Sequence, residues 1–205
     1  MVWISTAPAH PSNLRPLRHS FSETEQLQFS IECGERNIGG EPLGADCFPK
    51  EIYGAPHARE SNYGVPHLFF AGSYWVVSKA AADVLRQFDL GGGALYPVRF
   101  LKKDRQTPVA GEWYCLNFGN QKGVLVAGES QRLMDWPRER WHPPFVTKDG
   151  DIAVNQAAEA GSDIWVDPKI VRCFFLSEAL GKALKKVKAA NGFFLTKCRI
   201  VGVGH

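Results

Sequence analysis

The sequence has little excess charge and no long apolar stretch. Its 24 lysines and arginines stand against 21 aspartates and glutamates, a net charge of +3. This excess is too small and too dispersed to favour a polyanion such as nucleic acid as the partner. No run approaches the roughly 20 apolar residues that a membrane span needs, and the first residues lack the basic start and apolar stretch of a secretory signal. We therefore expect neither a nucleic-acid partner nor a membrane segment.

Cysteine is scarce and unpaired in its spacing. The five cysteines are an odd number and include no Cys-x-x-Cys motif, so the sequence does not predict a disulfide framework. Free cysteines in apolar runs behave as small buried hydrophobic residues, which favours a reducing compartment and hence a cytoplasmic protein. The five are Cys33, Cys47, Cys115, Cys173 and Cys198, and at least three of them lie in apolar, strand-like runs.

Metal-binding patterns are also missing. None of the six histidines forms a pair at i, i+4, and none lies beside a cysteine at the spacing of zinc ligands. The one set that can be drawn joins His57 and His67 to Cys33 and Cys47, which are distant in the sequence. We expect no metal and no cofactor.

The best-specified stretch is residues 74–101. The run Tyr74–Val77 predicts a buried strand, and apolar residues at helical spacing follow it. Ser78 is placed to cap that helix, since its hydroxyl can accept from an amide of the first turn. Gly91–Gly93 is expected to end the helix, and residues 94–101 to form a second strand, with Pro97 at an edge or a bulge. The predicted buried positions are Ala81, Val84, Leu85 and Phe88.

The same pattern recurs ninety-nine positions later, over residues 173–201. Ser177 then falls on Ser78, and a one-residue slip near the end brings Arg199-Ile200 over Arg99-Phe100. The repeat is either a duplication or two ordinary capped strand–helix–strand units. The corresponding buried positions are Leu180, Ala183, Leu184 and Val187.

The remaining segments predict more strands than helices. We expect strands at residues 26–33, 113–118, 124–127 and 164–166, a hairpin turn at 120–123, and a short helix at 131–136. A chain of 205 residues, 44% of them hydrophobic, can bury roughly 70% of its unfolded surface. The expected fold is a single α+β domain, 1–205, with a mostly antiparallel or mixed sheet and two strand–helix–strand units. Residues 1–68 form its irregular N-terminal portion, and the stretch 34–66 is functional or mobile.

One segment suggests a binding surface. The sequence WPRERWHPPF, residues 136–145, combines prolines with the residue types that dominate protein interfaces. We predict that Trp136, Arg138, Arg140 and Trp141 contact a partner. The alternative is a loop stiffened by proline whose tryptophans pack on the protein's own core. Asp163 and Asp167, four apart, form either a catalytic carboxylate pair or two turn-stabilising residues.

Residues 69–201 resemble a known family. The order VVSKAAADVL, LYPVRF, WYCLNF, DIWVDPKIVRCFFLSEALGKAL and GFFLTKCRIV is similar to the bacterial polymorphic-toxin immunity proteins of family eleven. The resemblance implies a cytoplasmic protein that binds and neutralises a cognate protein toxin and is not itself an enzyme. The alternative from the residues is a small cytoplasmic enzyme, a hydrolase or transferase, using dispersed Asp, His and Cys residues of the region 34–66.

Overall fold

The fold is α+β, as predicted. The computed structural model describes residues 1–23 and 25–202. Its helices are α1 (Leu27–Ile38), α2 (Lys79–Leu85) and α3 (Glu178–Lys186), and short 3-10 turns connect several elements. Its strands are β1 (Val2–Ser5), β2 (Leu14–Arg15), β3 (Leu17–His19), β4 (Glu51–Gly54), β5 (Leu68–Ala71), β6 (Tyr74–Ser78), β7 (Ala94–Leu101), β8 (Trp113–Asn117), β9 (Met134–Trp136), β10 (Arg140–His142), β11 (Ala153–Asn155), β12 (Ile164–Trp165), β13 (Phe174–Ser177), β14 (Leu195–Lys197) and β15 (Arg199–Val201).

The larger sheet has seven strands in the order β2-β5-β6-β8-β7-β4-β3. Strand β8 is antiparallel to both β6 and β7, so β6 and β7 run in the same direction with β8 between them. Helix α2 connects these two parallel strands, which makes β6–α2–β7 a crossover unit. On its outer side β7 pairs in parallel with β4, beginning at Arg99. At Pro97, therefore, the described strands give β7 a neighbour on one side only, where a proline is tolerated.

The second sheet has the same plan. Its order is β12-β13-β1-β14, and β1 is antiparallel to both β13 and β14. Helix α3 connects β13 to β14, so this unit is also a crossover around a central antiparallel strand. After Cys198, β15 pairs in parallel with β11, as β7 does with β4.

The residue registers of the two sheets coincide. Val76 pairs with Cys115 and Phe175 pairs with Ile4, positions ninety-nine apart on the strands before each helix. On the strands after the helices, Ile52 pairs with Phe100 and Val154 with Ile200, so the offset there is one hundred. The structure thus contains the predicted one-residue slip. A register shared along several strands favours a true duplication over two ordinary units.

We define the first repeat as residues 14–117 and the second repeat as residues 121–201 together with β1. The flanking strands match as well, because the parallel pairing of β2 with β5 corresponds to the parallel bridge from Gln121 to Val166. The central strand of each sheet comes from the other side of the chain's midpoint. When the chain is divided at the loop 103–106, its first half begins with β1, which completes the second sheet, and its second half begins with β8, which completes the first. The two halves of the chain therefore exchange their first strands.

Both crossover helices begin at the predicted serine caps. The Ser78 hydroxyl accepts from the Ala81 amide at 3.4 Å, and the Ser177 hydroxyl accepts from the Leu180 amide at 3.2 Å. Such caps satisfy an amide that has no partner within the helix.

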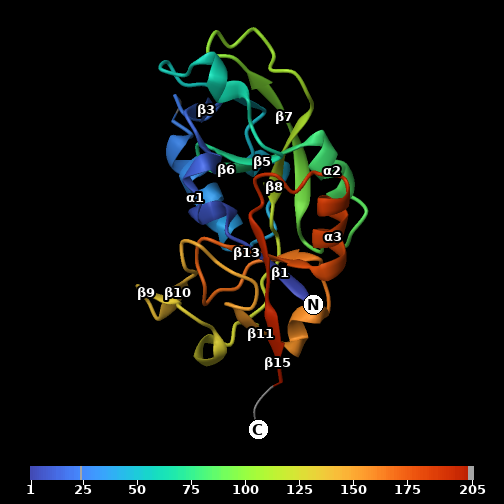
Figure 1. The fold of residues 1–205 in the computed structure, drawn as a ribbon. Helices are drawn as coiled ribbons and strands as arrows, with labels where there is room; N and C mark the ends of the chain where they lie inside the picture. Colours follow the sequence, from blue (N-terminus) through green and yellow to red (C-terminus); the bar gives the residue numbers. More distant parts are fainter. Residues whose placement is uncertain (24, 203–205) are drawn as a thin grey trace.

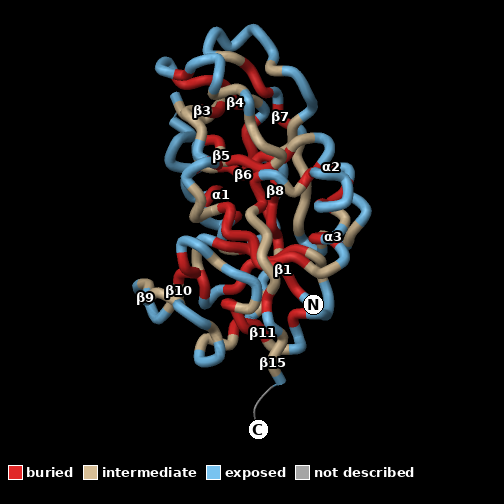
Figure 2. The backbone as a smooth tube through the Cα atoms, in the orientation of Figure 1, coloured by how far each residue is buried: buried red, intermediate tan, exposed pale blue. Residues whose placement is uncertain are grey.

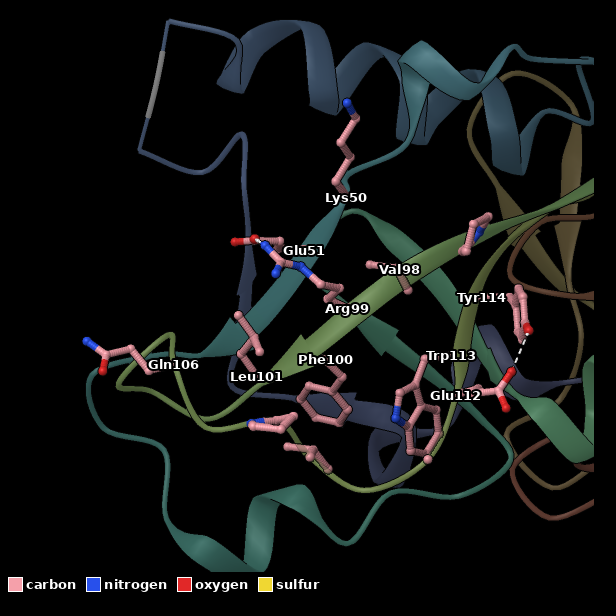
Figure 3. Close-up of a pocket in the computed structure, with 14 residues that line it drawn as sticks. Lys50, Glu51, Val98, Arg99, Phe100, Leu101, Gln106, Glu112, Trp113 and Tyr114 are labelled. Carbon is pink, nitrogen blue, oxygen red and sulfur yellow. Dashed lines mark hydrogen bonds and ion pairs between the residues drawn. The ribbon is translucent and has the colours of Figure 1, made fainter.

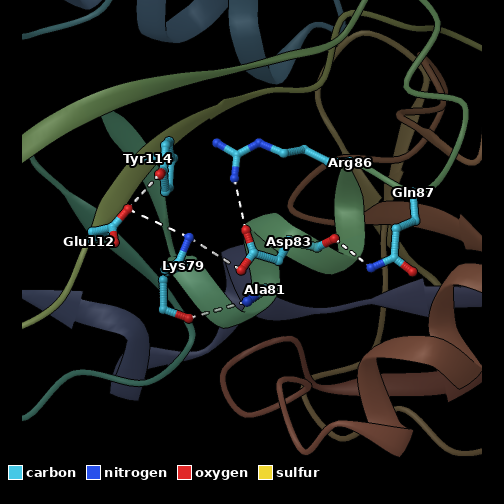
Figure 4. Close-up of polar contacts among 8 residues, drawn as sticks. Lys79, Ala81, Asp83, Arg86, Gln87, Glu112 and Tyr114 are labelled. Carbon is cyan, nitrogen blue, oxygen red and sulfur yellow. Dashed lines mark hydrogen bonds and ion pairs between the residues drawn. The ribbon is translucent and has the colours of Figure 1, made fainter.

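The repeats also share side-chain interactions. Lys79 and Asp83 form an i, i+4 ion pair on α2 (Figure 4), and the equivalent α3 pair, Glu178 with Lys182, has the charges reversed. Arg86, the C-cap residue of α2, lies over the Tyr114 ring at 4.3 Å, and the equivalent residue Lys185 lies over the Trp3 ring at 4.4 Å. Charge reversal preserves an ion pair, so these equivalences point to one ancestral arrangement.

The helices α2 and α3 lie side by side on one side of the molecule, and α1 and the β9–β10 hairpin lie on the other (Figure 1). The largest hydrophobic cluster combines both repeats around α2 and α3, and its fully buried members include Leu85, Leu116, Leu176 and Leu184. Two further clusters fill the opposite faces of the two sheets. The strands are buried through the middle of the molecule, whereas α1 and the hairpin are largely exposed (Figure 2).

The predicted inner faces of α2 and α3 are correct except at one position. Ala81, Val84, Leu85, Leu180 and Leu184 are buried, and Phe88 and Ala183 pack partly buried against the same cluster. Val187 is 53% exposed. Helix α3 ends at Lys186, so Val187 is the cap residue and turns away from the core.

Two secondary-structure predictions are wrong. Residues 26–33 were expected to form a strand because apolar residues alternate there, but the chain from Leu27 is α1. Its buried residues Ser30, Cys33, Gly34 and Asn37 have helical spacing and small size, so close packing on the sheet determines the conformation. Residues 131–136 contain no helix, because Met134–Trp136 pairs with β10 as a strand.

The turns near residues 91 and 120 also differ from expectation. Helix α2 ends at Leu85, before the three glycines, and Gly93 instead lies against strand β8, where an added Cβ would be 2.8 Å from the Phe118 carbonyl oxygen. Residues 120–123 do not close a hairpin. The segment after them makes only an isolated antiparallel bridge, from Leu125 to Val154, and β8 pairs with β6 and β7.

Candidate functional site

The predicted binding segment forms a β-hairpin. Trp136 pairs with Arg140 and Asp135 pairs with Trp141, which brings three of the four predicted contact residues into one small ladder and Arg138 to its tip. A parallel bridge from Trp141 to Ile170 attaches β10 to the rest of the second repeat. The hairpin projects from the molecule beside the second sheet (Figure 1).

The hairpin tip has an unusual backbone. Arg138 and Glu139 have φ angles of 64° and 54°, in the left-handed region that glycine and asparagine favour. Non-glycine residues in this region cost of order 1 kcal/mol each and are enriched at functional sites. The conformation turns both side chains into solvent, and both are exposed.

Trp136 and Arg140 lie on one face of the hairpin. The Arg172 guanidinium lies over the Trp136 ring at 4.9 Å, and the His142 ring is 5.7 Å from it. Arg140 donates from Nε to the Pro137 carbonyl oxygen at 3.3 Å. These contacts hold the Trp136 ring between the Arg172 guanidinium and the His142 imidazole at a half-buried position.

Trp141 lies on the opposite face and packs, partly buried, against the core cluster of the second repeat. Trp141 therefore matches the alternative stated from the sequence, in which a tryptophan of this segment packs on the protein's own core. His142 is buried, and burial is the main cause that lowers the pKa of its imidazole below the usual value. Of the four predicted residues, only Arg138 is exposed, whereas Trp136, Arg140 and Trp141 are half-buried.

The strongest apolar feature of this region is Phe145, which lies in the predicted segment but was not among the four predicted contact residues, together with Val146 just beyond it. Phe145 is 73% exposed and Val146 is 71% exposed, the highest fractions among the large hydrophobic residues of the described chain. The Phe145 ring lies 5.7 Å from the His142 ring, which connects this patch to the hairpin. The signal in the sequence was the run Pro143–Val146, in which two large apolar residues follow two prolines and belong to no helical or strand pattern.

A second concave feature lies between β7 and the segment that leads into β8 (Figure 3). The two strands pair up to Val98 and Trp113 and meet again at Leu101 and Pro108, so two residues of β7 face four on the other side. The bulge, which includes Gly111 at φ 110°, opens a groove of about 900 Å³.

The groove is apolar with charged edges. Trp113 packs edge-on against Phe69 and Phe100, at 5.6 Å from each ring. Arg99 and Glu51 form an ion pair at the rim, and Tyr114 donates to Glu112 at 3.1 Å (Figure 3). The described residues that line it include no histidine, cysteine or serine.

The region 34–66 was the predicted location of an enzyme site. Cys33 and Cys47 are buried in the core of the first repeat. Burial, with the neighbouring Cys47 as a further cause, raises the pKa of the Cys33 thiol to about 12. Because the thiolate is the nucleophile, a thiol with this pKa is inert at neutral pH.

The two aspartates of the segment Asp163–Asp167 stabilise the backbone. Asp167 is buried and accepts from the amides of Val124 and Leu125, both at 2.7 Å. The Asp163 carboxylate accepts from the Asp89 amide at 2.9 Å. Their hydrogen bonds match the turn-stabilising alternative.

Within residues 1–23 and 25–202, no three His, Cys, Asp or Glu side chains lie close enough to share a metal ion. His67, one member of the set drawn from the sequence, is hydrogen-bonded to Ser78 at 2.6 Å. The same residues contain no helix that is both long and apolar enough to cross a bilayer.

The arrangement at the hairpin is suited to recognition. It presents an exposed guanidinium, a half-buried aromatic ring and an apolar patch on a short, braced element, which is the composition of protein-interface hot spots. No protein-family model matches the chain, and no curated protein matches it either.

Proposed function

We propose that this protein is an immunity protein that binds and neutralises a cognate bacterial toxin in the cytoplasm, without catalysis of its own. The observation that carries the proposal is the β9–β10 hairpin with its adjacent exposed residues Phe145 and Val146. The resemblance of residues 69–201 to immunity family eleven supports the choice of partner.

The hairpin is preorganised, which lowers the free-energy cost of docking. Side chains and loops that are already ordered lose less entropy when a partner binds. The hairpin is ordered by its own ladder and by the bridge from Trp141 to Ile170, and buried Pro143 and Pro144 restrict the chain beyond it. Arg138 at the tip has no ion-pair partner among the described residues, so an acidic group of the toxin can pair with it.

The proposal predicts that a toxin domain is encoded beside the gene, and the test uses that domain. We expect the purified chain to bind this domain in calorimetry and to protect bacteria that express it. Arg138→Ala and Phe145→Ser should each raise the dissociation constant about thirtyfold, which corresponds to roughly 2 kcal/mol. The melting temperature should stay unchanged, because both side chains are exposed.

Lys186→Ala is the matched control. It removes one positive charge from exposed α3, on the side of the molecule opposite the hairpin (Figure 1), and should leave the affinity unchanged. If Lys186→Ala and Arg138→Ala lose affinity equally, the loss comes from the change in net charge and not from a contact of Arg138. If Arg138→Ala and Phe145→Ser both bind as tightly as the unaltered chain, the interface lies elsewhere.

A further inference from the structure

The two repeats carry different insertions at the same place. In the first repeat, residues 20–50 lie between β3 and its antiparallel neighbour β4, and include α1. In the second, residues 127–152 lie between the strand-like segment at Leu125 and its antiparallel neighbour β11, and include the hairpin. Both insertions lie on the side of the molecule away from α2 and α3 (Figure 1).

These insertions hold most of the exposed apolar residues. Of the nine large hydrophobic residues that are exposed in the described chain, six belong to them. The second repeat, all of it within the described chain, forms the equivalent strands without a helix in the position of α1. Helix α1 is therefore an addition to the strands and crossover helix that the two repeats share. The six residues are Leu27, Phe29, Ile31, Ile38, Phe145 and Val146.

Helix α1 reverses the usual distribution, in which a helix buries its large apolar residues and exposes its small and polar ones. It buries Ser30, Cys33, Gly34 and Asn37 and exposes its aliphatic residues. The inner face is tightly specified. Asn37 donates to the Leu116 carbonyl oxygen at 2.9 Å and accepts from the Phe118 amide at 3.0 Å, and a Cβ at Gly34 would be 2.8 Å from the Ser73 carbonyl oxygen. The fold thus fixes the helix in the rotation that turns the aliphatic residues outward.

Those aliphatic residues form a stripe. At 3.6 residues per turn, Leu27, Ile31 and Ile38 fall within an arc of about 40°, and they are 38% to 54% exposed. Glu35 and Glu32 follow on the solvent side of the stripe, and neither has an ion-pair partner among the described residues. A complementary surface is apolar with lysine or arginine beside it.

We infer that the stripe Leu27–Ile31–Ile38 with Glu32 and Glu35 is a second docking surface for the same partner protein, and that it receives a basic, apolar part of that partner. The inference rests on the proposed function. It assigns the hairpin and α1 to one bipartite interface, in which Arg138 faces an acidic group and α1 faces a basic one. Opposite charges at the two ends of the interface fix the orientation of the partner.

A second copy of this chain is the competing occupant. Two stripes from identical chains would bring Glu32 and Glu35 of one copy toward those of the other, and this like-charge contact opposes association. The charge beside the stripe therefore favours a basic partner.

The experiment measures binding of the full chain to the toxin domain encoded beside the gene. The double variant Ile31→Ser/Ile38→Ser should raise the dissociation constant about tenfold, and Glu35→Lys should raise it by a similar factor that shrinks as salt is added. Val187→Ser is the matched control, since it removes an equally exposed aliphatic residue from the α3 side. Circular dichroism melting checks that all variants stay folded.

Each outcome decides one point. If Arg138→Ala weakens binding and the α1 variants do not, the inference about α1 is wrong and the proposed function stands. If the unaltered chain does not bind the toxin domain, both are wrong. If light scattering shows a dimer that the double variant abolishes, the stripe receives a second copy, and the inference is wrong in its occupant.

Discussion

Gly181 of α3 is the position at which the structure makes its sharpest stability prediction. Trp3 of β1 is buried, and its indole lies against the helix at this residue. A Cβ added to Gly181 would lie 2.6 Å from Trp3 Nε1 and 2.8 Å from Trp3 Cγ. In the first repeat the equivalent residues are Ala82 and Tyr114, a larger helix residue with a smaller ring.

Two opposing effects set the magnitude of Gly181→Ala. Alanine is favoured over glycine in a helix interior by about 1 kcal/mol. Overpacking a well-filled core costs typically about 1–3 kcal/mol, and the upper part of that range applies because Trp3 is in a central strand, paired with β13 and β14. The expected result is a net loss of about 1–2 kcal/mol in the free energy of unfolding.

A double-mutant cycle measured by urea denaturation isolates the contact. Trp3→Tyr alone should destabilise the protein, because it leaves space beside a glycine. Adding Gly181→Ala to Trp3→Tyr recreates the pair of the first repeat and should restore stability. The coupling between the two changes should be about 1 kcal/mol or more in favour of the double variant.

Two results would refute the reasoning. If Gly181→Ala alone stabilises the protein by its full helix-propensity gain, the indole moves aside without penalty. If the two changes are additive, Ala82 with Tyr114 and Gly181 with Trp3 are not equivalent pairs, and the correspondence of the repeats fails at this position.

The remaining predictions concern the core, the strand exchange and a buried histidine. Leu184→Ala should lower the free energy of unfolding by about 2–5 kcal/mol, whereas Val187→Ala should change it by less than about 0.5 kcal/mol; equal effects in denaturant titrations contradict the face assignment. Cleavage at a protease site placed in the exposed loop 103–106 should leave the two parts in one peak in gel filtration, because each completes the other's sheet through its first strand; separation under native conditions contradicts the exchange. Burial lowers the pKa of His19 to about 4 from its usual 6.5, so the unfolded chain binds more protons between these values and stability falls as the pH drops through them. The contribution of His19, at most about 3 kcal/mol, should be lost in urea titrations of His19→Gln and kept in His57→Gln, whose side chain is exposed. Buried His142, whose pKa burial also lowers, gives a dependence of the same sign in both variants, so an unchanged dependence in His19→Gln would show that His19 does not contribute. Mass spectrometry of the unreduced protein should find five free thiols, as in the structure, and a stoichiometric disulfide contradicts the reducing compartment.

The sequence by itself determined the α+β class, the two crossover helices, their serine caps and the shared offset of the repeats. These features depend on local causes. A hydroxyl before a helical apolar period caps the helix wherever the unit is placed, and a buried helix face needs apolar residues every three or four positions. The exposed end of α3 was missed because Val187 continues the period while the cap ends the helix.

Tertiary structure alone decided the strand exchange, the identity of α1 and the orientation of the hairpin. Nothing local in Val2–Ser5 indicates that it pairs between β13 and β14, since the pairing partners are more than 150 residues away. The alternating apolar residues of α1 predicted a strand, and the close approach of Gly34 to Ser73 with the hydrogen bonds of Asn37 selected a helix. Trp136 and Trp141 are alike in sequence and both half-buried, yet the ladder register placed them on opposite faces of the hairpin, with Trp141 against the core cluster of the second repeat. Strand pairing, the conformation of α1 and the orientation of the hairpin depend on contacts between segments that are distant in the sequence. A local sequence pattern shows which residues can be buried but not which segment they pack against.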